Sequence, residues 1–245
     1  MTHRRFFINP ETIVKDKVSI REKDTIHHIL KVLRLKEKDT ISVLDGLGNE
    51  YNVVITSTAQ DRIMGEIVEK ITHPATKIEL TLVQALPKIT KMDFVISKCT
   101  ELGIRRIIPV KTQRSVVNLK DESTKFARWK RIAKSSSAQS QRAEIPIIHP
   151  ITNLTTSLEL IKEIDLGLIL YEKAKGLLRD VFNRNIKFKK IAIFVGPEGG
   201  FTHQEITEVE AKGIIAVSLG HNILRCETAP IVACSIILYE LGMIG

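Results

Sequence analysis

Two glycine-rich segments near the carboxyl end of the sequence have residue types suited to binding a ligand. They are IAIFVGPEGGF at residues 191–201 and LGHNILRCETA at residues 219–229. Each continues a short β-branched apolar run, which is typical of a buried parallel strand. Glycine has no Cβ, so backbone groups at Gly196, Gly199 and Gly200 can approach a ligand closely. We therefore expect two neighbouring loops at one edge of a sheet to form a pocket.

The residues after the first loop predict the start of a helix. Thr202 precedes Glu205 by three positions, the spacing of a capping box, and a helix N-terminus here can hold an anion. The motif GxxxxGK[ST] is absent, and the segment is not a GxGxxG that opens the first βαβ unit of a domain. These features argue against a phosphate-loop ATPase and a Rossmann site, while a plain tight turn remains the alternative for an isolated glycine loop.

Alternating strand and helix patterns must position these loops. They predict an α/β fold with a mostly parallel sheet in the second part of the chain. The last helix is apolar on nearly all sides, which fits burial or a subunit contact. The predicted strands cover residues 78–86, 106–110, 166–171, 191–195 and 214–219, and the predicted helices cover residues 92–102, 125–138, 204–211 and 230–241.

The first part of the chain has the pattern of a small mixed β-barrel. Short β-rich runs are separated by turn signals such as Asp45-Gly46, and a single helical stripe covers residues 25–33. His73-Pro74 interrupts the strand pattern. We place a domain boundary there, which divides the chain into residues 1–72 and 73–245.

Positive charge is concentrated in one segment. The chain has a net charge of +9, and residues 77–142 contain 15 Lys and Arg against 5 Asp and Glu. Such an excess indicates a polyanionic partner, with nucleic acid as the leading candidate and a solvated basic surface as the alternative. The arginines recur over several predicted elements, at Arg105, Arg106, Arg114, Arg128, Arg131 and Arg142.

Other residue patterns exclude several protein classes. The three cysteines form no CxxC pair and the histidines have no HxxxH spacing, so we predict no disulfide framework and no metal site. No apolar run reaches membrane-spanning length, and the first residues lack the pattern of a secretory signal. We expect a cytoplasmic protein without a membrane partner.

These motifs together resemble the RsmE-type family of 16S ribosomal RNA uridine N3-methyltransferases in the SPOUT superfamily. The similarity extends over essentially the whole chain and includes RRFFI, HHILKVLRLKEKD, LPKITKMDFVISKCTELG, Arg114-Ser115 and AQSQR. It implies a PUA-like β-barrel domain followed by an α/β SPOUT domain with a deep trefoil knot. It also implies S-adenosylmethionine as the cofactor, a homodimer, and 16S rRNA or the small ribosomal subunit as the partner.

The resemblance also implies roles for individual residues. Arg225 would stabilise negative charge on the uracil carbonyls, and Glu198 or Glu227 would position the base or accept its N3 proton. An ion pair of Arg225 with either glutamate is the alternative. The cofactor would contact Leu170, Tyr171, Glu172, Val195, Gly196, Pro197, Glu198, Gly199, Gly200, Leu219, Gly220, Ile223, Leu224, Arg225, Glu227, Thr228 and Ala229. RNA would contact Arg4, Arg5, Lys31, Arg34, Lys88, Lys91, Arg114 and Arg142, for which ordinary surface charge is the alternative.

The sequence departs from the family pattern at four positions. His221 and Asn222 stand where an arginine is frequent, and Cys226 replaces the usual threonine. Gln141 stands where a glycine often follows the Gln-Ser pair. We interpret Cys226 as a tolerated small residue, because N3 alkylation needs no covalent addition to the uracil ring. Two other functions remain open, a SPOUT-type ribose 2′-O-methyltransferase and a non-catalytic RNA-binding or ribosome-assembly protein.

Overall fold

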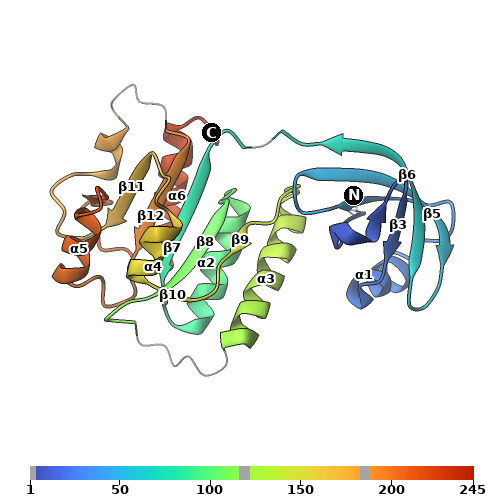
Figure 1. The fold of residues 1–245 in the computed structure, drawn as a ribbon, viewed down its shortest axis with the longest axis horizontal. Helices are drawn as coiled ribbons and strands as arrows, with labels where there is room; N and C mark the ends of the chain where they lie inside the picture. Colours follow the sequence, from blue (N-terminus) through green and yellow to red (C-terminus); the bar gives the residue numbers. More distant parts are fainter. Residues whose placement is uncertain (1–3, 75, 116–121, 183–187) are drawn as a thin grey trace. The chain divides into compact units, whose positions relative to one another are not determined.

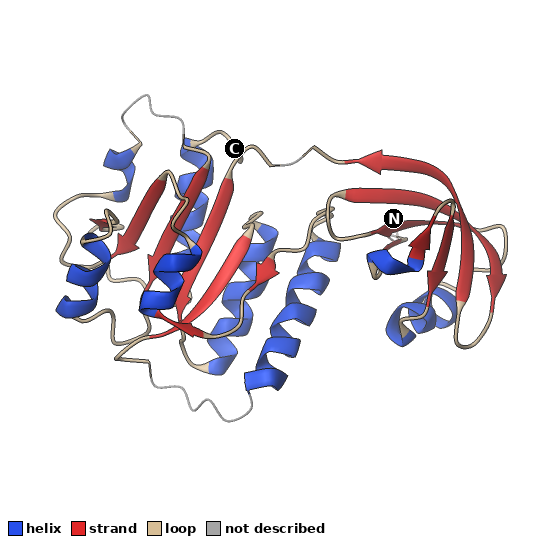
Figure 2. Ribbon diagram, viewed as in Figure 1, coloured by secondary structure: helices blue, strands red, loops and turns tan. Residues whose placement is uncertain are grey.

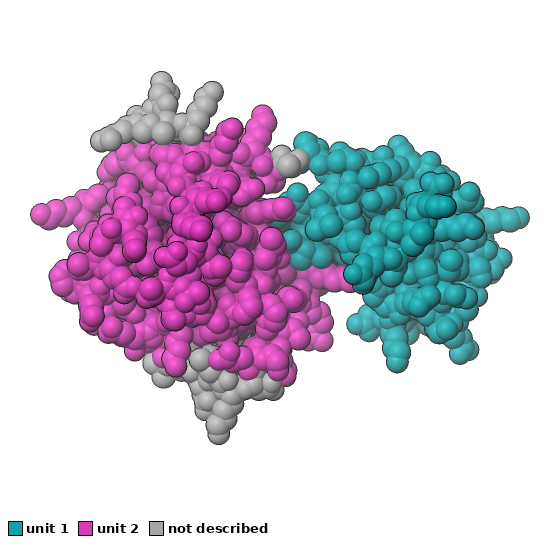
Figure 3. All heavy atoms as spheres, in the orientation of Figure 1, with its two compact units in different colours: residues 1–75, 137–145 teal, residues 76–136, 146–245 magenta. Residues whose placement is uncertain are grey.

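The computed structural model describes residues 4–74, 76–115, 122–182 and 188–245, and the chain divides into two compact units (Figure 3). The N-terminal unit comprises residues 1–75 and 137–145, and the C-terminal unit comprises residues 76–136 and 146–245. The chain therefore returns to its first unit for nine residues. A boundary placed between residues 72 and 73 does not include this return.

In the N-terminal unit, six strands form one sheet in the order β1-β4-β5-β6-β3-β2 (Figure 1). All neighbouring strands are antiparallel except β1 and β4, which are parallel. The predicted helical stripe forms a short α-helix that continues as a π-helix. The elements are β1 (Arg5–Phe7), η1 (Pro10–Thr12), β2 (Ile13–Val14), β3 (Lys17–Ile20), α1 (Lys23–His27), η2 (His28–Val32), β4 (Thr40–Leu44), β5 (Asn49–Thr58) and β6 (Ile63–Thr72).

Alternating residues of these strands build the N-terminal core. Ile41 and Val43 of β4 are buried and pack with Ile26 and Ile29 of the helical segment. The predicted turn between β4 and β5 is confirmed, since Gly46 has a φ of +74° that a side chain would strain. The sheet thus buries one set of alternate side chains under a small helix.

In the C-terminal unit, all strand pairs of the sheet are parallel, as the sequence predicts. The strand order is β10-β8-β7-β12-β11-β13, and β9 pairs with β8 outside this path (Figure 1). The strands β9 and β10 and the helix α4 were not predicted. The strands are β7 (Glu79–Ala85), β8 (Arg106–Lys111), β9 (Ile147–Ile148), β10 (Thr152–Asn153), β11 (Leu166–Leu170), β12 (Lys190–Val195) and β13 (Ile215–Val217).

Helices cover both faces of this parallel sheet (Figure 2). On one face, Val83, Ala192 and Phe194 pack against residues of α4 and α5. Helix α6 contacts α2, β7 and β12 and covers the other face. The helical elements are α2 (Ile89–Glu101), α3 (Glu122–Gln139), α4 (Leu154–Leu160), η3 (Leu178–Val181), α5 (His203–Glu210) and α6 (Ala229–Glu240).

Candidate functional site

A cavity of about 670 Å³ lies at the carboxyl ends of three adjacent strands. Leu170 ends β11, Val195 ends β12 and Val217 ends β13, and all three residues line the cavity. Neighbouring parallel strands end on the same side of a sheet, so the loops that follow them meet there. The loops after β12 and β13 are the two glycine-rich segments that the sequence predicts to be neighbours.

The first loop, residues 196–200, is a tight turn that depends on its glycines. The Gly200 N–H donates to the Pro197 carbonyl at 2.9 Å, and Gly200 has a φ of +66°. A Cβ on Gly196 would lie 3.2 Å from the Cα of Gly200. The Arg114 guanidinium donates from Nη1 to the Gly199 carbonyl at 2.8 Å, so Arg114 supports the loop from outside. The loop backbone is therefore held at the cavity wall.

The predicted capping box after this loop is confirmed. Thr202 Oγ1 accepts the Glu205 N–H at 3.2 Å, and Glu205 Oε2 accepts the Thr202 N–H at 2.8 Å. The second carboxylate oxygen of Glu205 accepts the Gln113 N–H at 2.8 Å. Glu205 is buried, and its two carboxylate oxygens fix the start of α5 and the loop after β8 through these hydrogen bonds.

We expect Thr202→Ala to lower the free energy of unfolding of the C-terminal unit by about 1 kcal/mol, because an orphan N–H of α5 loses its acceptor. Urea unfolding measures this change. Thr207→Ala is the matched control, since the exposed Thr207 hydroxyl donates to the His203 carbonyl within the same helix and to no other described residue. Equal unfolding midpoints for Thr202→Ala and the native protein would contradict the capping role.

The second loop, residues 219–229, contributes most of the remaining cavity lining. Gly220 has a φ of +120°, and its N–H donates to the Ser218 hydroxyl at 3.2 Å. Ile223 is 84 % exposed and Leu224 is half-buried, so both present apolar surface at the cavity. The loop passes directly into α6, which begins at Ala229.

An ion-pair cluster joins the two loops beside the cavity. Lys91 Nζ lies 3.1 Å from Glu198 Oε1 and 3.1 Å from Glu227 Oε2. The same nitrogen lies 3.7 Å from Cys226 Sγ, and this thiol donates to Glu227 Oε2 at 3.2 Å. Glu198 Oε1 also accepts the Lys88 N–H at 3.3 Å, at the N-cap of α2.

The cluster shifts the ionisation of its members. Hydrogen bonds to Glu198 and Glu227 raise the pKa of Lys91. Burial alone would raise the pKa of Glu198 and of Glu227. Hydrogen bonds from backbone N–H groups and from Lys91 nevertheless hold the pKa of each glutamate below its ordinary value, and at Glu227 the Cys226 thiol adds a further hydrogen bond. Burial and the Glu227 carboxylate raise the pKa of Cys226 to about 12, so its thiol stays protonated.

Arg225 lines the cavity and is exposed. In the part of the chain that the structure describes, the Arg225 guanidinium has no ion pair or side-chain hydrogen bond. The alternative, an ion pair with Glu198 or Glu227, does not form, and both of these carboxylates contact Lys91. The guanidinium is therefore available to a ligand.

The cavity gathers nearly all residues expected to hold the cofactor. Glu227 and Thr228 are outside the lining, although Glu227 reaches the cavity through Lys91. Six lining residues were not among the individual cofactor contacts expected from the sequence, although three of them lie in the second glycine-rich segment, residues 219–229, that was expected to form the pocket. These six are Lys91, Val217, Ser218, His221, Asn222 and Cys226.

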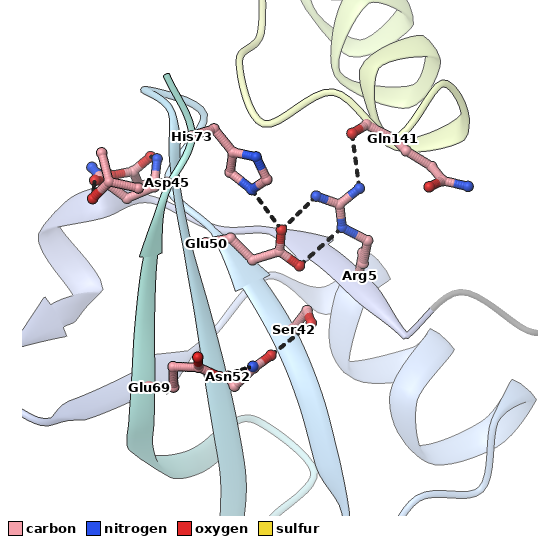
Figure 4. Close-up of polar contacts among 10 residues, drawn as sticks. Arg5, Ser42, Asp45, Glu50, Asn52, Glu69, His73 and Gln141 are labelled. Carbon is pink, nitrogen blue, oxygen red and sulfur yellow. Dashed lines mark hydrogen bonds and ion pairs between the residues drawn. The ribbon is translucent and has the colours of Figure 1, made fainter. Parts of the chain in front are cut away.

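The residues expected to contact RNA have different environments. Arg5 is in an ion pair with Glu50, with Nη2 2.7 Å from Oε2, and it also donates to the Gln141 carbonyl at 2.8 Å (Figure 4). His73 Nε2 lies 2.8 Å from the same Glu50 oxygen. Arg4 lies 3.9 Å from Asp39. The side chains of Lys31, Arg34, Lys88 and Arg114 are exposed, and that of Arg142 is half-buried.

The described residues lack two kinds of feature. No helix among them is both long and apolar enough to cross a membrane. No group of three or more His, Cys, Asp and Glu side chains within the same ranges is arranged to hold a metal ion.

Comparison with known proteins matches both units. A family model described as an RNA methyltransferase domain matches residues 74–238, and one described as an RNA methyltransferase PUA domain matches residues 20–67. The chain is 30 % identical to ribosomal RNA small subunit methyltransferase E of Bacillus subtilis over 229 residues, which are 90 % of each chain.

Two solved structures with S-adenosylmethionine have the same fold. The ribosomal RNA small subunit methyltransferase E of Neisseria gonorrhoeae is 30 % identical, with 97 % of each chain covered and a TM-score of 0.85. The methyltransferase Lpg2936 of Legionella pneumophila is 25 % identical, with 98 % of each chain covered and a TM-score of 0.86. Both were determined with S-adenosylmethionine bound.

Proposed function

Because the chain belongs to the ribosomal RNA small subunit methyltransferase E family, we propose that it transfers a methyl group from S-adenosylmethionine to N3 of a uridine in 16S ribosomal RNA. The observation that carries this proposal is the cavity at the carboxyl ends of β11, β12 and β13, which is enclosed by the two glycine loops. The relatives with bound cofactor match the chain over nearly its whole length.

The cavity fits S-adenosylmethionine in size and in chemistry. Its volume of about 670 Å³ is in the range of small-molecule sites. Leu170, Ile223 and Leu224 offer apolar surface to an adenine ring, and the carboxylate of Glu172 suits a positively charged ligand. The turn that requires Gly200 brings backbone groups to the wall. When bound, the cofactor supplies a methyl group activated by a sulfonium.

In the reaction that we propose, the uracil imide loses its N3 proton as the new bond to carbon forms. Negative charge develops on the uracil carbonyl oxygens as this proton leaves, and it is neutralised when N3 bonds to the methyl carbon and the carbon–sulfur bond of the donor breaks. The guanidinium of Arg225, which has no partner among the described residues, is suited to stabilise this charge, because it places a cation at the cavity. Glu198 and Glu227 are already charged and engaged with Lys91, so they are suited to hold the site in shape. The proton passes to water or to a group supplied by the RNA complex.

The N-terminal PUA-like unit supplies the other part of the RNA contact in this proposal. Arg4, Lys31 and Arg34 are exposed on this unit. Arg142 belongs to the returning segment, residues 137–145, and so to the same unit. Lys88 and Arg114 expose cations on the C-terminal unit, where Arg114 also supports the first glycine loop. Such contacts to phosphates position the RNA without reading its sequence.

We also propose that the C-terminal unit is knotted, that the protein is a homodimer and that it acts in the cytoplasm. The insertion of β12 between β7 and β11 is compatible with a trefoil knot. Helix α6 remains partly exposed in one chain, with half-buried Ile231, Val232 and Ile236 and a 66 % exposed Tyr239. Such an apolar face suits contact with a second copy.

Nucleoside analysis tests the proposed reaction. Purified protein, methyl-labelled S-adenosylmethionine and small ribosomal subunits are incubated, and the digested rRNA is analysed by mass spectrometry. We expect labelled N3-methyluridine, which is absent when the protein is omitted. Labelled 2′-O-methylnucleoside in its place would assign the chain to ribose methylation, and cofactor binding without any labelled nucleoside would indicate a non-catalytic RNA-binding protein.

A further inference from the structure

One lysine contacts both glycine loops from a third segment of the chain. Lys91 lies in the first turn of α2, Glu198 lies in the first loop and Glu227 lies near the end of the second loop. The side chains are partly shielded from solvent, with exposures of 27 %, 36 % and 17 % in that order. No other lysine or arginine among the described residues is paired with either carboxylate.

The charge balance of this cluster makes the lysine important to both loops. Two carboxylates share a single ammonium, so the removal of Lys91 leaves two like charges in a partly buried space. The Lys88 N–H still donates to Glu198 and the Cys226 thiol still donates to Glu227, but neither donor carries a positive charge that could join the loops.

We propose that Lys91 is a positioning residue for methyl transfer, which holds residues 196–200 and 219–229 in the arrangement that binds S-adenosylmethionine. This inference rests on the proposed function, and it replaces the RNA contact expected of Lys91 from the sequence. Lys91 acts through Glu198 and Glu227, which fix the backbone of the two cavity walls.

The proposal predicts a pH dependence that only the variant has. In the native protein the ammonium keeps both carboxylates charged over the whole range from mildly acidic to alkaline pH. In Lys91→Met, burial and mutual repulsion raise the pKa of the two carboxyls, so protonation of one of them at low pH relieves the repulsion. The groups that face the carboxylates are the Lys88 N–H and the Cys226 thiol, and the other titratable or charged side chains of the cavity are Glu172, His221 and Arg225.

The test compares Lys91→Met with Lys91→Arg and with Lys98→Met. Lys98 is on the same helix and forms a surface ion pair with Glu101, so its variant controls for the loss of one lysine from α2. Calorimetry at pH 8 should give S-adenosylmethionine binding about tenfold weaker in Lys91→Met than in the native protein. The ratio of the two dissociation constants should fall toward one at pH 5.5. Lys91→Arg should restore most of the affinity, and Lys98→Met should bind normally.

Hydrogen exchange of the ligand-free proteins gives an independent measurement. Amides of residues 196–200 and 219–229 should exchange faster in Lys91→Met than in the native protein. Glu227→Gln leaves the pair between Lys91 and Glu198, so faster exchange should be confined to residues 219–229. This second variant keeps the proposal testable if Lys91→Met does not fold.

The outcomes separate the inference from the proposed function. Unchanged exchange in both loops with native affinity in Lys91→Met would overturn the role of Lys91. A loss of affinity that is equal at pH 8 and pH 5.5, or that Lys98→Met shares, would overturn it as well. Failure of the native protein itself to bind S-adenosylmethionine would instead refute the proposed function, while the exchange data would still decide whether Lys91 holds the loops.

Discussion

The substitution Arg225→Ala is expected to slow methyl transfer by about 100-fold to 1,000-fold while the protein remains folded. The guanidinium lines the cavity and is exposed, and the structure gives it no partner among the described residues. Its loss therefore removes no contact that stabilises the fold, but it removes the cation proposed to stabilise charge on the uracil. Single-turnover rates with small ribosomal subunits measure the effect, and thermal unfolding checks the fold.

Two further variants define what the Arg225 result means. Arg225→Lys keeps the charge without the planar guanidinium, so we expect partial activity. Arg179 lies in the same unit but outside the cavity, and its side chain is 74 % exposed. Arg179→Ala should therefore turn over at the native rate. Native turnover by Arg225→Ala would remove Arg225 from the mechanism, and a parallel loss of folding would make its role structural.

The substitution Glu50→Gln is expected to lower the free energy of unfolding of the N-terminal unit by about 3 kcal/mol at pH 7. Glu50 accepts two hydrogen bonds from Arg5, at 3.1 and 2.7 Å, and both side chains are largely buried, with exposures of 11 % and 16 %. The variant leaves the Arg5 guanidinium without its charged partner. Urea unfolding of the full chain measures the loss, and faster hydrogen exchange in residues 137–145 should accompany it, because Arg5 also donates to the Gln141 carbonyl.

The Glu50 effect should depend on pH in a defined direction. Burial alone would raise the pKa of Glu50, but hydrogen bonds from Arg5 and His73 hold it below its ordinary value of 4.5. A carboxyl with a depressed pKa stabilises the fold above its unfolded pKa and loses this contribution as pH falls through the folded value. The difference between native protein and variant should thus be complete at pH 7 and shrink below about pH 4.5.

Glu69→Gln is the matched control for this prediction. Glu69 lies on the same sheet and is exposed, and among the described residues its carboxylate accepts only the Asn52 side-chain amide, at 2.7 Å (Figure 4). We expect its effect to stay within about 0.5 kcal/mol. If Glu50→Gln were as mild as Glu69→Gln, the Arg5 pair would contribute little to stability, and Arg5 would again be a candidate RNA contact.

Local patterns in the sequence predict the central architecture well. The apolar runs at residues 191–195 and 106–110 form β12 and β8, because long buried strands need continuous β-branched residues. The Thr202 and Glu205 spacing correctly predicts the start of α5. The strands β9 and β10 are only two residues long, so neither carries a periodic signal.

Pairings between distant residues limited the prediction of individual roles. Arg5 and Lys91 are basic residues in a basic protein, and the sequence alone favours RNA contacts for both. The structure pairs Arg5 with Glu50 and Lys91 with Glu198 and Glu227. Lys91 and Cys226 touch although 135 positions separate them in the chain, and no local spacing rule connects such residues.

The returning segment has a consequence for the order of events during synthesis. Phe7 and Leu44 pack against Ala143, which is made long after the first six strands are complete. A nascent chain that has emerged only as far as β6 therefore has an uncovered apolar patch and an Arg5 without the Gln141 carbonyl. The N-terminal unit can therefore finish folding only after residues 137–145 have left the ribosomal exit tunnel.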